Sequence, residues 1–410
     1  MLNVVQFSGG RGTRCLTEAF LTYPNCNLIS IVNAYDDGKS SGELRRFFGM
    51  LGPSDIRKTQ QTMIPTSDPN REAFDRIFDY RFPDNATHEH CISVLNDFAS
   101  GQSDRVGDLA VEPAEIRATL RIITASFLNG LKDAEATLGA PFNFADCSFI
   151  NCLYAGAFLL FQRSFARTAA YFDKLFGIRG TVLTTNSENK KLVAIRESGE
   201  VLYSEAEIVE LRSNVRIRDI FLVDEYPSRS VVDAMALEDR YRYLKSLQIG
   251  VAADGAVLRA IADADILIYG PGTQHSSLYP SYMTLGIPDA IAQNRHAVKI
   301  FVCNIGEDYE TPQYTASELI KGAYRYLNRM TNVTFSPADL FDYAFVNNPG
   351  SSDNRKYITN DTATALDLGV PVISDNFEDP DNLGKHNGRK LVALSMKILR
   401  ESLSKQAHAA

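Results

Sequence analysis

The sequence lacks the cysteine pairs that build disulfide frameworks or zinc sites. Its six cysteines are scattered, and no two of them form a CxxC pair or a zinc-type spacing. They are Cys15, Cys26, Cys91, Cys147, Cys152 and Cys303. This distribution predicts buried thiols in a reducing compartment, and we therefore expect a cytoplasmic protein.

Long apolar runs are missing as well. No stretch approaches the roughly 20 apolar residues that are needed to cross a bilayer, so we expect no membrane partner. The apolar start of the chain, residues 1–8, lacks the charged segment and the cleavage site of a signal peptide, and Gly9 ends it early. This start is therefore predicted to be a strand.

Positive charge is scarce relative to negative charge. The 42 lysines and arginines are outnumbered by 50 aspartates and glutamates, which gives a net charge of -8. Because affinity for a polyanion requires clustered basic residues, this balance argues against a nucleic-acid partner and favours a small ligand. The nucleophile-elbow, Walker-lysine and HExxH motifs are also absent, so three common enzyme classes receive no support.

The start of the chain has a strand, helix, strand pattern. Apolar residues 2–7 precede the turn Ser8–Thr13, a helical stretch to Tyr23 and a second apolar run at 28–32. A βαβ unit of this kind implies a parallel sheet. We therefore predict an α/β fold.

The rest of the chain changes character twice. Apolar residues recur at helical spacing over 41–50, 72–80, 113–138 and 148–176. After Gly177, short β-rich pieces predict a meander of strands at 180–184, 192–195 and 201–203. From Ala253 the α/β alternation returns, with strands at 266–269 and 299–303, a last strand at 342–346 and a closing helix at 390–403.

These changes predict one α/β domain over residues 1–404 and a disordered tail at 405–410. The main sheet is expected from residues 1–58 and 253–346. A mainly helical part is expected at 59–176 and a β excursion at 177–223. The sequence leaves the oligomeric state open, including a homo-oligomer.

The first glycine turn is a candidate phosphate site. It consists of Ser8, Gly9, Gly10, Arg11, Gly12 and Thr13, and it joins a strand to a helix. Such a turn lets backbone N–H groups and the positive end of the helix dipole face an anion. As a dinucleotide fingerprint it is imperfect, because Cys15 stands where a third glycine belongs. The alternative is a tight βα turn without a ligand.

An acidic loop follows the second strand. Asp36 and Asp37 are adjacent there, and Gly38, Lys39, Ser40, Ser41 and Gly42 come next. Paired aspartates can hold a magnesium ion, bind ribose hydroxyls or take a proton as a general base. The alternative is that Ser40 or Ser41 caps the next helix and that the aspartates are solvated. Just downstream, Asp55 and Arg57 lie in the first turn of another predicted helix and are further candidates.

A second glycine turn follows the strand at 266–269. It contains Gly270, Pro271, Gly272 and Thr273, and His275 lies just beyond it. Ligands of open α/β sheets bind outside the carboxyl ends of the strands, so both glycine turns are expected to face one crevice. His275 is a candidate contact, although a lone histidine near a helix start is more often a positioning residue than a proton carrier.

Seven segments of the chain resemble the CofD-like family, and they occur in the family's order. The segments are FSGGRGT (7–13), VNAYDDGKSSGELR (32–45), GPSDIRK (52–58), FINCLYAG (149–156), GIRGTVL (177–183), ADILIYGPGTQHSSLYPSYMTLGIPDAI (264–291) and VCNIGEDYETPQYTASE (302–318). The family includes the 2-phospho-L-lactate transferase and the bacterial gluconeogenesis factors. The stretch from about residue 59 to residue 144 has no counterpart among these segments.

The resemblance implies a Rossmann-like α/β domain that binds a nucleotide across its strand ends. Gly9, Gly10, Gly12 and Thr13 would lie at the phosphates, with the second glycine turn and Asn304 beside them. Asp36 would lie near a magnesium ion and the acceptor, and Asn151 matches the family's helix asparagine. Three residues depart from the family pattern: Arg11 replaces a common threonine, Lys39 a glycine of the DDGGSSG form, and Ile150 a glycine.

Three hypotheses follow. The first is a transferase that moves a phospho-acyl group, of the phospholactyl type, from a GDP- or UDP-type donor to an acceptor alcohol, with magnesium and with Asp36 or Asp37 as catalytic residues. The second, which the resemblance to the gluconeogenesis factors implies, is a regulatory protein that binds a UDP-sugar without turnover. The third, an NAD-dependent oxidoreductase, is disfavoured by Cys15 and by the lack of a hydride-transfer constellation.

Overall fold

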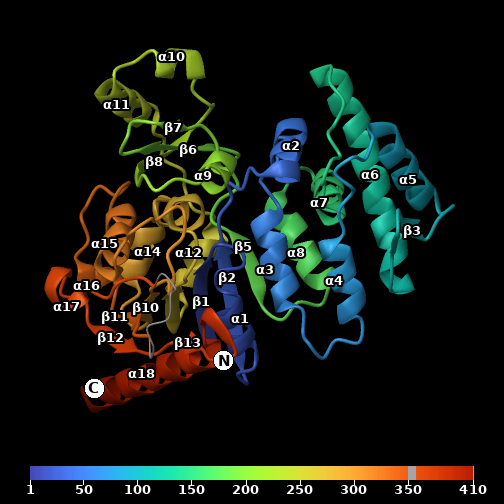
Figure 1. The fold of residues 1–410 in the computed structure, drawn as a ribbon. Coiled ribbons are helices and arrows are strands. Elements are labelled where there is room, and N and C mark those ends of the chain that lie inside the picture. Colours follow the sequence, from blue (N-terminus) through green and yellow to red (C-terminus); the bar gives the residue numbers. More distant parts are fainter. Residues whose placement is uncertain (350–356, 410) are drawn as a thin grey trace. The chain divides into compact units, whose positions relative to one another are not determined.

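The computed structural model describes residues 1–349 and 357–409 (Figure 1). The chain divides into two compact units. Unit 1 consists of residues 1–33, 183–186 and 190–410, and unit 2 consists of residues 34–182 and 187–189. Residues 1–33 and 253–346 of the predicted sheet region belong to unit 1, whereas residues 34–58 of it belong to unit 2 together with the predicted helical region 59–176.

Unit 1 contains a seven-stranded sheet with the order β12-β11-β10-β9-β1-β2-β5. Its strands are β1 (Leu2–Ser8), β2 (Cys26–Val32), β5 (Thr181–Thr184), β9 (Ile266–Tyr269), β10 (Val298–Val302), β11 (Tyr343–Asn347) and β12 (Val372–Asp375). Neighbours from β12 to β2 pair in parallel. The predicted α/β fold with a parallel sheet is therefore confirmed.

The burial of the central strands β1 and β9 explains why their sequences are continuous apolar runs and do not alternate between apolar and polar residues. Residues 4–8 of β1 and all of β9 are buried, because helices cover both faces of a parallel sheet. In the register Phe7 pairs with Tyr269, so β1 and β9 end side by side. The turns that follow these two strands are therefore neighbours.

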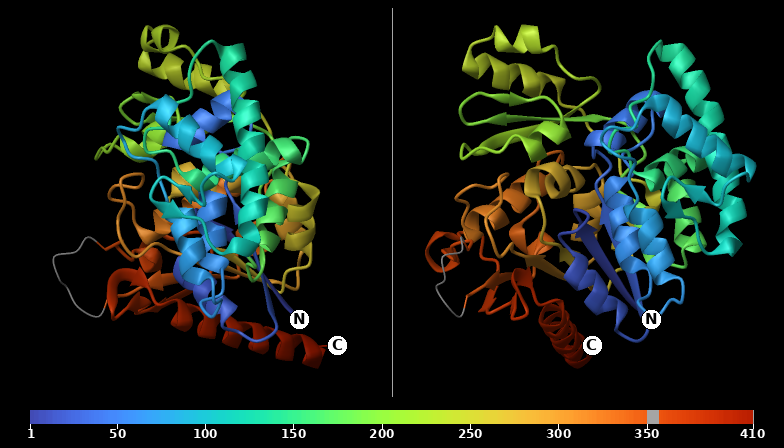
Figure 2. Two further views of the ribbon diagram at one scale, coloured as in Figure 1. Left: turned by 90° about the vertical axis from the view of Figure 1, so that its right-hand side faces the viewer. Right: turned by 45° about the vertical axis from the view of Figure 1, so that its right-hand side comes forward.

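Helices of unit 1 follow the strands of its main sheet. They are α1 (Arg14–Leu21), α12 (Gly255–Ala262), α13 (Tyr279–Tyr282), α14 (Ile287–Gln293), α15 (Ala316–Leu327), α16 (Pro337–Leu340), α17 (Thr362–Ala365) and α18 (Gly388–Ala409). The long α18 lies along the N-terminal α1 (Figure 2). A Cβ at Gly388 would lie 2.0 Å from the Cys15 carbonyl oxygen, so a glycine permits this close contact.

Unit 1 also contains small antiparallel sheets. The first consists of β7 (Val201–Leu202), β6 (Lys191–Arg196) and β8 (Ile217–Val223), with helices α9 (Glu205–Glu210), α10 (Arg229–Asp233) and α11 (Leu237–Leu247). Its core includes buried Val193, Phe221 and Leu244. A hairpin of β13 (Glu378–Asp379) and β14 (Asn382–His386) precedes α18.

Unit 2 is mainly helical, as predicted. Its elements are α2 (Lys39–Phe48), α3 (Ser54–Met63), α4 (Arg71–Asp79), α5 (His88–Ser100), β3 (Arg105–Val106), β4 (Leu109–Ala110), α6 (Ala114–Leu138), α7 (Phe149–Leu160) and α8 (Phe165–Leu175). Residues 149–158 of α7 are all buried, because the helix is apolar around its whole circumference and packs in the centre of the unit.

Three sequence-based assignments are wrong in detail. The helix predicted over 148–176 is two helices, α7 and α8, because Ser164 caps α8 by accepting a hydrogen bond from the Arg167 backbone N–H. The strand predicted at 180–184 is β5 of the main sheet and not part of the meander. The strand at 342–346 is not the last, because β12 pairs beyond it.

The predicted disorder of residues 405–410 is also not observed, since α18 continues to Ala409 and residue 410 lies outside the described residues. Residues 405–409 contain neither glycine nor proline, so nothing in their sequence stops a helix that has already formed. Among the helices of the described residues, none is both long and apolar enough to span a membrane.

Candidate functional site

The first glycine turn connects β1 to α1 as expected. The Ser8 and Thr13 hydroxyls, 2.5 Å apart, close the turn at its base. Gly10 has a φ of 68°, a left-handed conformation that favours glycine. Arg11 is exposed at the surface of the turn. The turn thus presents backbone groups and one guanidinium.

The second glycine turn packs directly on the first. A Cβ at Gly12 would lie 2.4 Å from the Pro271 carbonyl oxygen, and one at Gly9 would lie 2.8 Å from the Ser277 Cβ. A Cβ at Gly270 would lie 2.5 Å from the Phe7 carbonyl oxygen. The structure therefore confirms that both turns lie together at the carboxyl ends of β1 and β9. Only glycines allow backbones to approach so closely.

Asn304 holds the second turn in shape. Its Nδ2 donates to the Gly272 carbonyl at 2.9 Å, and its Oδ1 accepts from the Gly272 N–H at 3.1 Å. Both ends of the amide are therefore engaged by one glycine. We interpret Asn304 as a residue that positions the turn, although the sequence suggested a direct phosphate contact.

His275 lies in a short π-helix, η1 (Gln274–Leu278), that follows the second turn. Its ring is buried among aromatic rings, with the Tyr279 centroid 5.1 Å and the Tyr314 centroid 6.1 Å away. Burial lowers the pKa of His275 to about 3, so the ring is neutral at physiological pH. This environment does not suit proton transfer near neutral pH.

Glu310 is a functional candidate that the sequence did not single out. The Glu310 carboxylate is buried in unit 1 and lies at the start of η1. Its Oε2 accepts from the His275 and Ser276 N–H groups, each at 2.9 Å, and Oε1 is 2.6 Å from the Ser276 hydroxyl. Glu310 thus ties the loop after β10 to the helix that follows the second turn. Burial, with Asp308 as a second cause, raises its pKa to about 8.

We expect Glu310→Gln to flatten the pH dependence of stability. A carboxyl with a folded pKa above its unfolded pKa stabilises the protein at low pH, and this stabilisation is lost as pH rises from about 4.5 toward 8. Glutamine keeps the shape and removes the titration. Melting temperatures of both proteins across this range test the prediction, and parallel curves would contradict it.

The titratable groups near Glu310 allow its effect to be isolated when the melting temperatures of the wild type and of Glu310→Gln are compared. Asp308 is the charged neighbour that raises its pKa, and His275 stays neutral through the whole range because its own pKa is near 3. All other titrations are common to the wild type and the variant. The difference between the two curves therefore isolates Glu310, apart from its coupling to Asp308.

Asp36 has an open carboxylate oxygen within unit 2. Its Oδ2 is buried and has no hydrogen-bond partner among the described residues. The carboxylate of Asp55 is its electrostatic neighbour: burial raises the pKa of Asp55, and Asp36 raises it further. Lys58 offsets this in part, with Nζ 3.3 Å from Asp55 Oδ1. A buried acceptor without a donor is costly unless a cation or a ligand completes it.

Asp37 differs from Asp36 because it is held by the protein. Its Oδ1 lies 3.7 Å from Arg45 Nη1. The Arg45 guanidinium is buried and also donates to the carbonyls of Tyr35 and Asp36, at 2.8 and 3.2 Å. Arg45 therefore fixes the backbone of the acidic loop. One indirect signal of this role is present in the sequence, since Arg45 shares a helix face with buried apolar residues.

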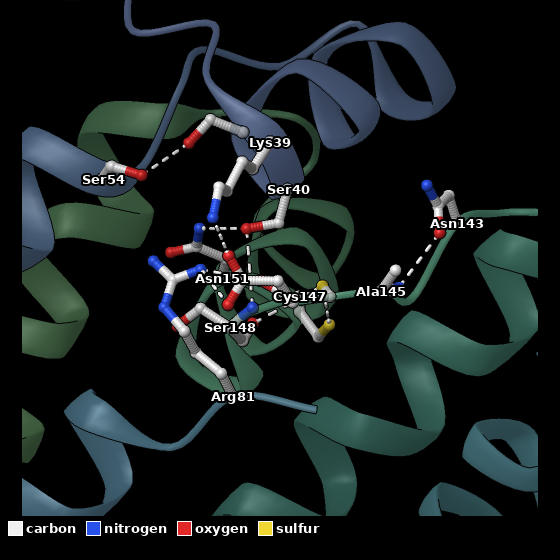
Figure 3. Close-up of polar contacts among 12 residues, drawn as sticks. Lys39, Ser40, Ser54, Arg81, Asn143, Ala145, Cys147, Ser148 and Asn151 are labelled. Carbon is white, nitrogen blue, oxygen red and sulfur yellow. Dashed lines mark hydrogen bonds and ion pairs between the residues drawn. The ribbon is translucent and has the colours of Figure 1, made fainter. Parts of the chain in front are cut away.

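The remaining polar residues predicted in this loop are engaged within unit 2 (Figure 3). Asn151 Nδ2 donates to the Ser40 hydroxyl at 3.0 Å, and the Ser41 and Ser54 hydroxyls are 2.7 Å apart. Lys39 pairs with Asp146, which also pairs with Arg81. These contacts fix the start of α2, so Ser40, Ser41 and Asn151 shape the loop.

Arg57 is also used inside unit 2. Its Nη1 donates to the Phe78 carbonyl at 3.0 Å, and the side chain is buried. This contact fastens α3 to the end of α4. It gives Arg57 a structural role that the sequence did not suggest.

A magnesium ion fits Asp36 and Asp55 in one specific way. No group of three or more His, Cys, Asp and Glu side chains able to hold a metal is found within the described residues. Magnesium, however, is commonly held by one or two carboxylates while water and ligand phosphates supply the other oxygens. The open Oδ2 of Asp36, with Asp55 near it, is a donor set of this smaller kind.

Comparison with known proteins gives one consistent result. The sequence model described as 2-phospho-L-lactate transferase CofD matches residues 4–378. The chain is 24% identical to the gluconeogenesis factor of Halalkalibacterium halodurans, over 95% of this chain and 94% of that one. It is also 24% identical to a protein of Aquifex aeolicus, over 98% of both chains.

A solved structure has a fold similar to that of this chain. A UPF0052-family protein from Bacillus halodurans has a TM-score of 0.66 and 22% identity, over 97% of this chain and 100% of that one. The match to the family covers most of the chain, including both glycine turns and the acidic loop. The chain therefore belongs to the CofD family.

Proposed function

We propose that this protein binds a nucleoside-diphosphate-linked small molecule and transfers its phospho-acyl group to an acceptor alcohol. The observation that carries the proposal is the packing of two glycine turns at the ends of β1 and β9, with a Cβ at Gly12 excluded by the Pro271 carbonyl. In the second turn the Gly270 and Gly272 N–H groups are used within the protein, by the Phe7 carbonyl and by Asn304 Oδ1, so it is the backbone N–H groups of the first turn that are proposed to bind the phosphate oxygens. Arg11 adds an exposed cation on the same turn.

Asp36 is the proposed catalytic carboxylate. It lies four residues beyond Val32, the last residue of β2, so the covalent chain keeps it within about 14 Å of that strand end. Its open Oδ2 accepts the proton of the acceptor hydroxyl. The acceptor oxygen then forms a bond to phosphorus, the anhydride P–O bond breaks, and the nucleoside monophosphate leaves with the electron pair.

Asp36 Oδ2 is the proton acceptor in this scheme, so magnesium would be held by Asp55 and by the ligand phosphates, with Asp36 beside it. When bound, it would supply positive charge that neutralises the leaving phosphate. The protein itself contributes the shape of the loop: Arg45 holds the Asp36 carbonyl and Asp37. Asp37 is accordingly proposed as a positioning residue.

A second candidate is a binder of UDP-sugars without turnover. It is compatible with the name gluconeogenesis factor, which is carried by the relative from Halalkalibacterium halodurans that aligns with 95% of this chain. The loop DDGKSSGELR is also closer to the form found in those factors than to the transferase form. The two candidates share the phosphate site and differ in turnover.

A thermal-shift screen tests the common part of both candidates. GDP, GTP, UDP, UDP-sugars and NAD are each added with and without Mg²⁺. A ligand at 100 times its dissociation constant stabilises the folded protein by about 2.7 kcal/mol, which gives a clear rise in melting temperature. We expect one nucleotide class to stabilise the protein and NAD not to. Absence of any shift would overturn the nucleotide site.

A further inference from the structure

Unit 1 contains a surface groove that the proposed transfer does not use. The groove lies between α12 and α14, which are labelled in Figure 1, and has a volume of about 470 Å³. Its accessible lining is mainly apolar and includes Leu258, Ala262, Gly286 and Ala290. Ala262 is exposed and the other three residues are half-buried, so this apolar lining is in contact with water. Covering it with a partner would be favourable.

Contacts at both ends of the groove hold α12 and α14 side by side. Gly286, the N-cap of α14, has a φ of 89°, and a Cβ there would lie 3.4 Å from Leu258 Cδ2. At the other end, Asn294 Nδ2 donates to the carbonyls of Ile261 and Ala264, at 2.8 and 2.9 Å. The helices precede the neighbouring parallel strands β9 and β10, so they run in the same direction. The groove is therefore a fixed feature of unit 1.

The apolar surface continues beyond the groove. Leu285 directly precedes Gly286 and is 37% exposed. A Cβ at Gly250 would lie 2.8 Å from Leu285 Cδ1 and 3.6 Å from Met330 Cε, so the side chains of Leu285 and Met330 lie close together. Contiguous exposed apolar surface of this kind is typical of interaction sites.

The groove carries two charges of opposite sign. Arg259 belongs to α12 and Asp289 to α14, and both are exposed. Neither forms an ion pair with any residue in the part of the chain that the structure describes. Arg259 is one residue beyond Leu258, and Asp289 is three residues beyond Gly286, the neighbour of Leu258. Since a helix rises about 1.5 Å per residue, the two are offset by about 3 Å along the helices. His296, the other titratable residue of the lining, lies beyond the end of α14.

We infer that this groove is an interface between two copies of the chain. A two-fold axis along the groove places α12 of each copy on α14 of the other, and the four helices then form a bundle around the apolar lining. Because Arg259 and Asp289 lie at similar heights on opposite sides, the same rotation brings Arg259 of one copy to Asp289 of the partner subunit. Symmetry forms this ion pair twice.

The charges distinguish a second copy from other partners. An acidic partner would pair with Arg259 and be repelled by Asp289, and a basic partner would meet the reverse conflict. A second copy satisfies both charges with the same surface. The inference does not depend on the proposed transfer, because none of these residues belongs to the glycine turns or the acidic loop.

Sedimentation velocity of the full chain, at protein concentrations of about 1 to 100 µM, tests the inference. We expect a monomer–dimer equilibrium for the wild type. Arg259→Glu and Asp289→Arg should each raise the dissociation constant of the dimer by about 100-fold or more, because each reversal places two pairs of like charges in the interface. Their circular dichroism spectra should match that of the wild type, since both residues are exposed.

An equal mixture of the two variants gives the decisive result. In a mixed dimer the new glutamate of one chain meets the new arginine of the other, and the native Asp289 of the first meets the native Arg259 of the second. The mixture should therefore form dimers with nearly wild-type affinity, although each variant alone is a monomer. Misfolded variants could not produce this recovery.

Two further variants serve as controls. Arg389→Glu reverses an exposed charge on α18, outside the groove, and should dimerise like the wild type. Ala262→Trp keeps both charges but fills the groove, so it should prevent the dimer. A wild type that stays monomeric at every concentration would show that the groove has another occupant or none, and would overturn the inference. Charge variants that dimerise like the wild type, or a mixture of them that stays monomeric, would overturn it as well.

Discussion

Asp36→Asn is expected to lower turnover by about 100-fold or more, equivalent to about 2.7 kcal/mol of transition-state stabilisation. The Oδ2 of Asp36 is buried without a donor, so the oxygen is available for an acceptor proton or a cation. Asparagine keeps the shape and removes both capacities. Turnover is measured with the nucleotide-linked donor identified by the thermal-shift screen, at saturating Mg²⁺.

The stability of the Asp36→Asn variant should rise or stay the same, although its turnover falls. Asp36 raises the pKa of the buried Asp55, which means that the two carboxylates repel each other in the folded protein. Removing the charge of Asp36 relieves this repulsion, so the melting temperature of Asp36→Asn should equal or exceed that of the wild type. A variant that loses activity through unfolding would melt lower.

Asp37→Asn is the matched control for the same loop. Asp37 is 3.7 Å from the buried Arg45, so its charge has a protein partner. This variant should lose stability because it leaves the guanidinium with less compensation, and its turnover should fall less than that of Asp36→Asn. Equal turnover in Asp36→Asn and the wild type would refute the catalytic role. If no turnover is found in any form, the binding function without transfer is favoured.

The sequence predicted the sheet more accurately than the helices. The strand predicted at 266–269 is β9 residue for residue, because a short apolar run between a helix and a glycine turn has few other solutions. The break between α7 and α8 was missed, because Gln162 and Arg163 adopt left-handed conformations that nothing local announces. The tertiary contact of Arg163 with Phe48, 115 residues away in sequence, supports this break.

The site was predicted in its backbone and less completely in its side chains. Glycines mark positions where two backbone segments can approach each other closely, so both turns could be located from the sequence. Buried charged residues such as Glu310 and Arg45 could not be located from the sequence, because their roles depend on hydrogen-bond partners that are distant in the sequence and come close only in the folded chain. His275 shows the reverse error, since its ring is an attractive catalytic group in a sequence and a buried neutral one in the structure.

Gly12→Ala is expected to weaken nucleotide binding by about 100-fold, or about 2.7 kcal/mol. The new Cβ would lie 2.4 Å from the Pro271 carbonyl oxygen and 2.7 Å from the Gly272 Cα. Both obstacles are backbone atoms and cannot rotate away, so the two turns must separate. Phosphate-binding amides that are displaced in this way lose their common geometry. Calorimetric titration with GDP and with UDP measures the effect.

Gly255→Ala is the matched control in the same unit, because a Cβ there would meet only the end of the flexible Arg259 side chain, at 3.3 Å. It should bind nucleotide like the wild type. Hydrogen exchange adds a readout that needs no ligand: amides of residues 9–13 and 270–273 should exchange faster in Gly12→Ala than in Gly255→Ala, because separated turns expose them. Faster exchange with normal nucleotide affinity would show that the turns are packed as described but that the phosphate lies elsewhere. Unchanged exchange would show that the two turns do not depend on this contact.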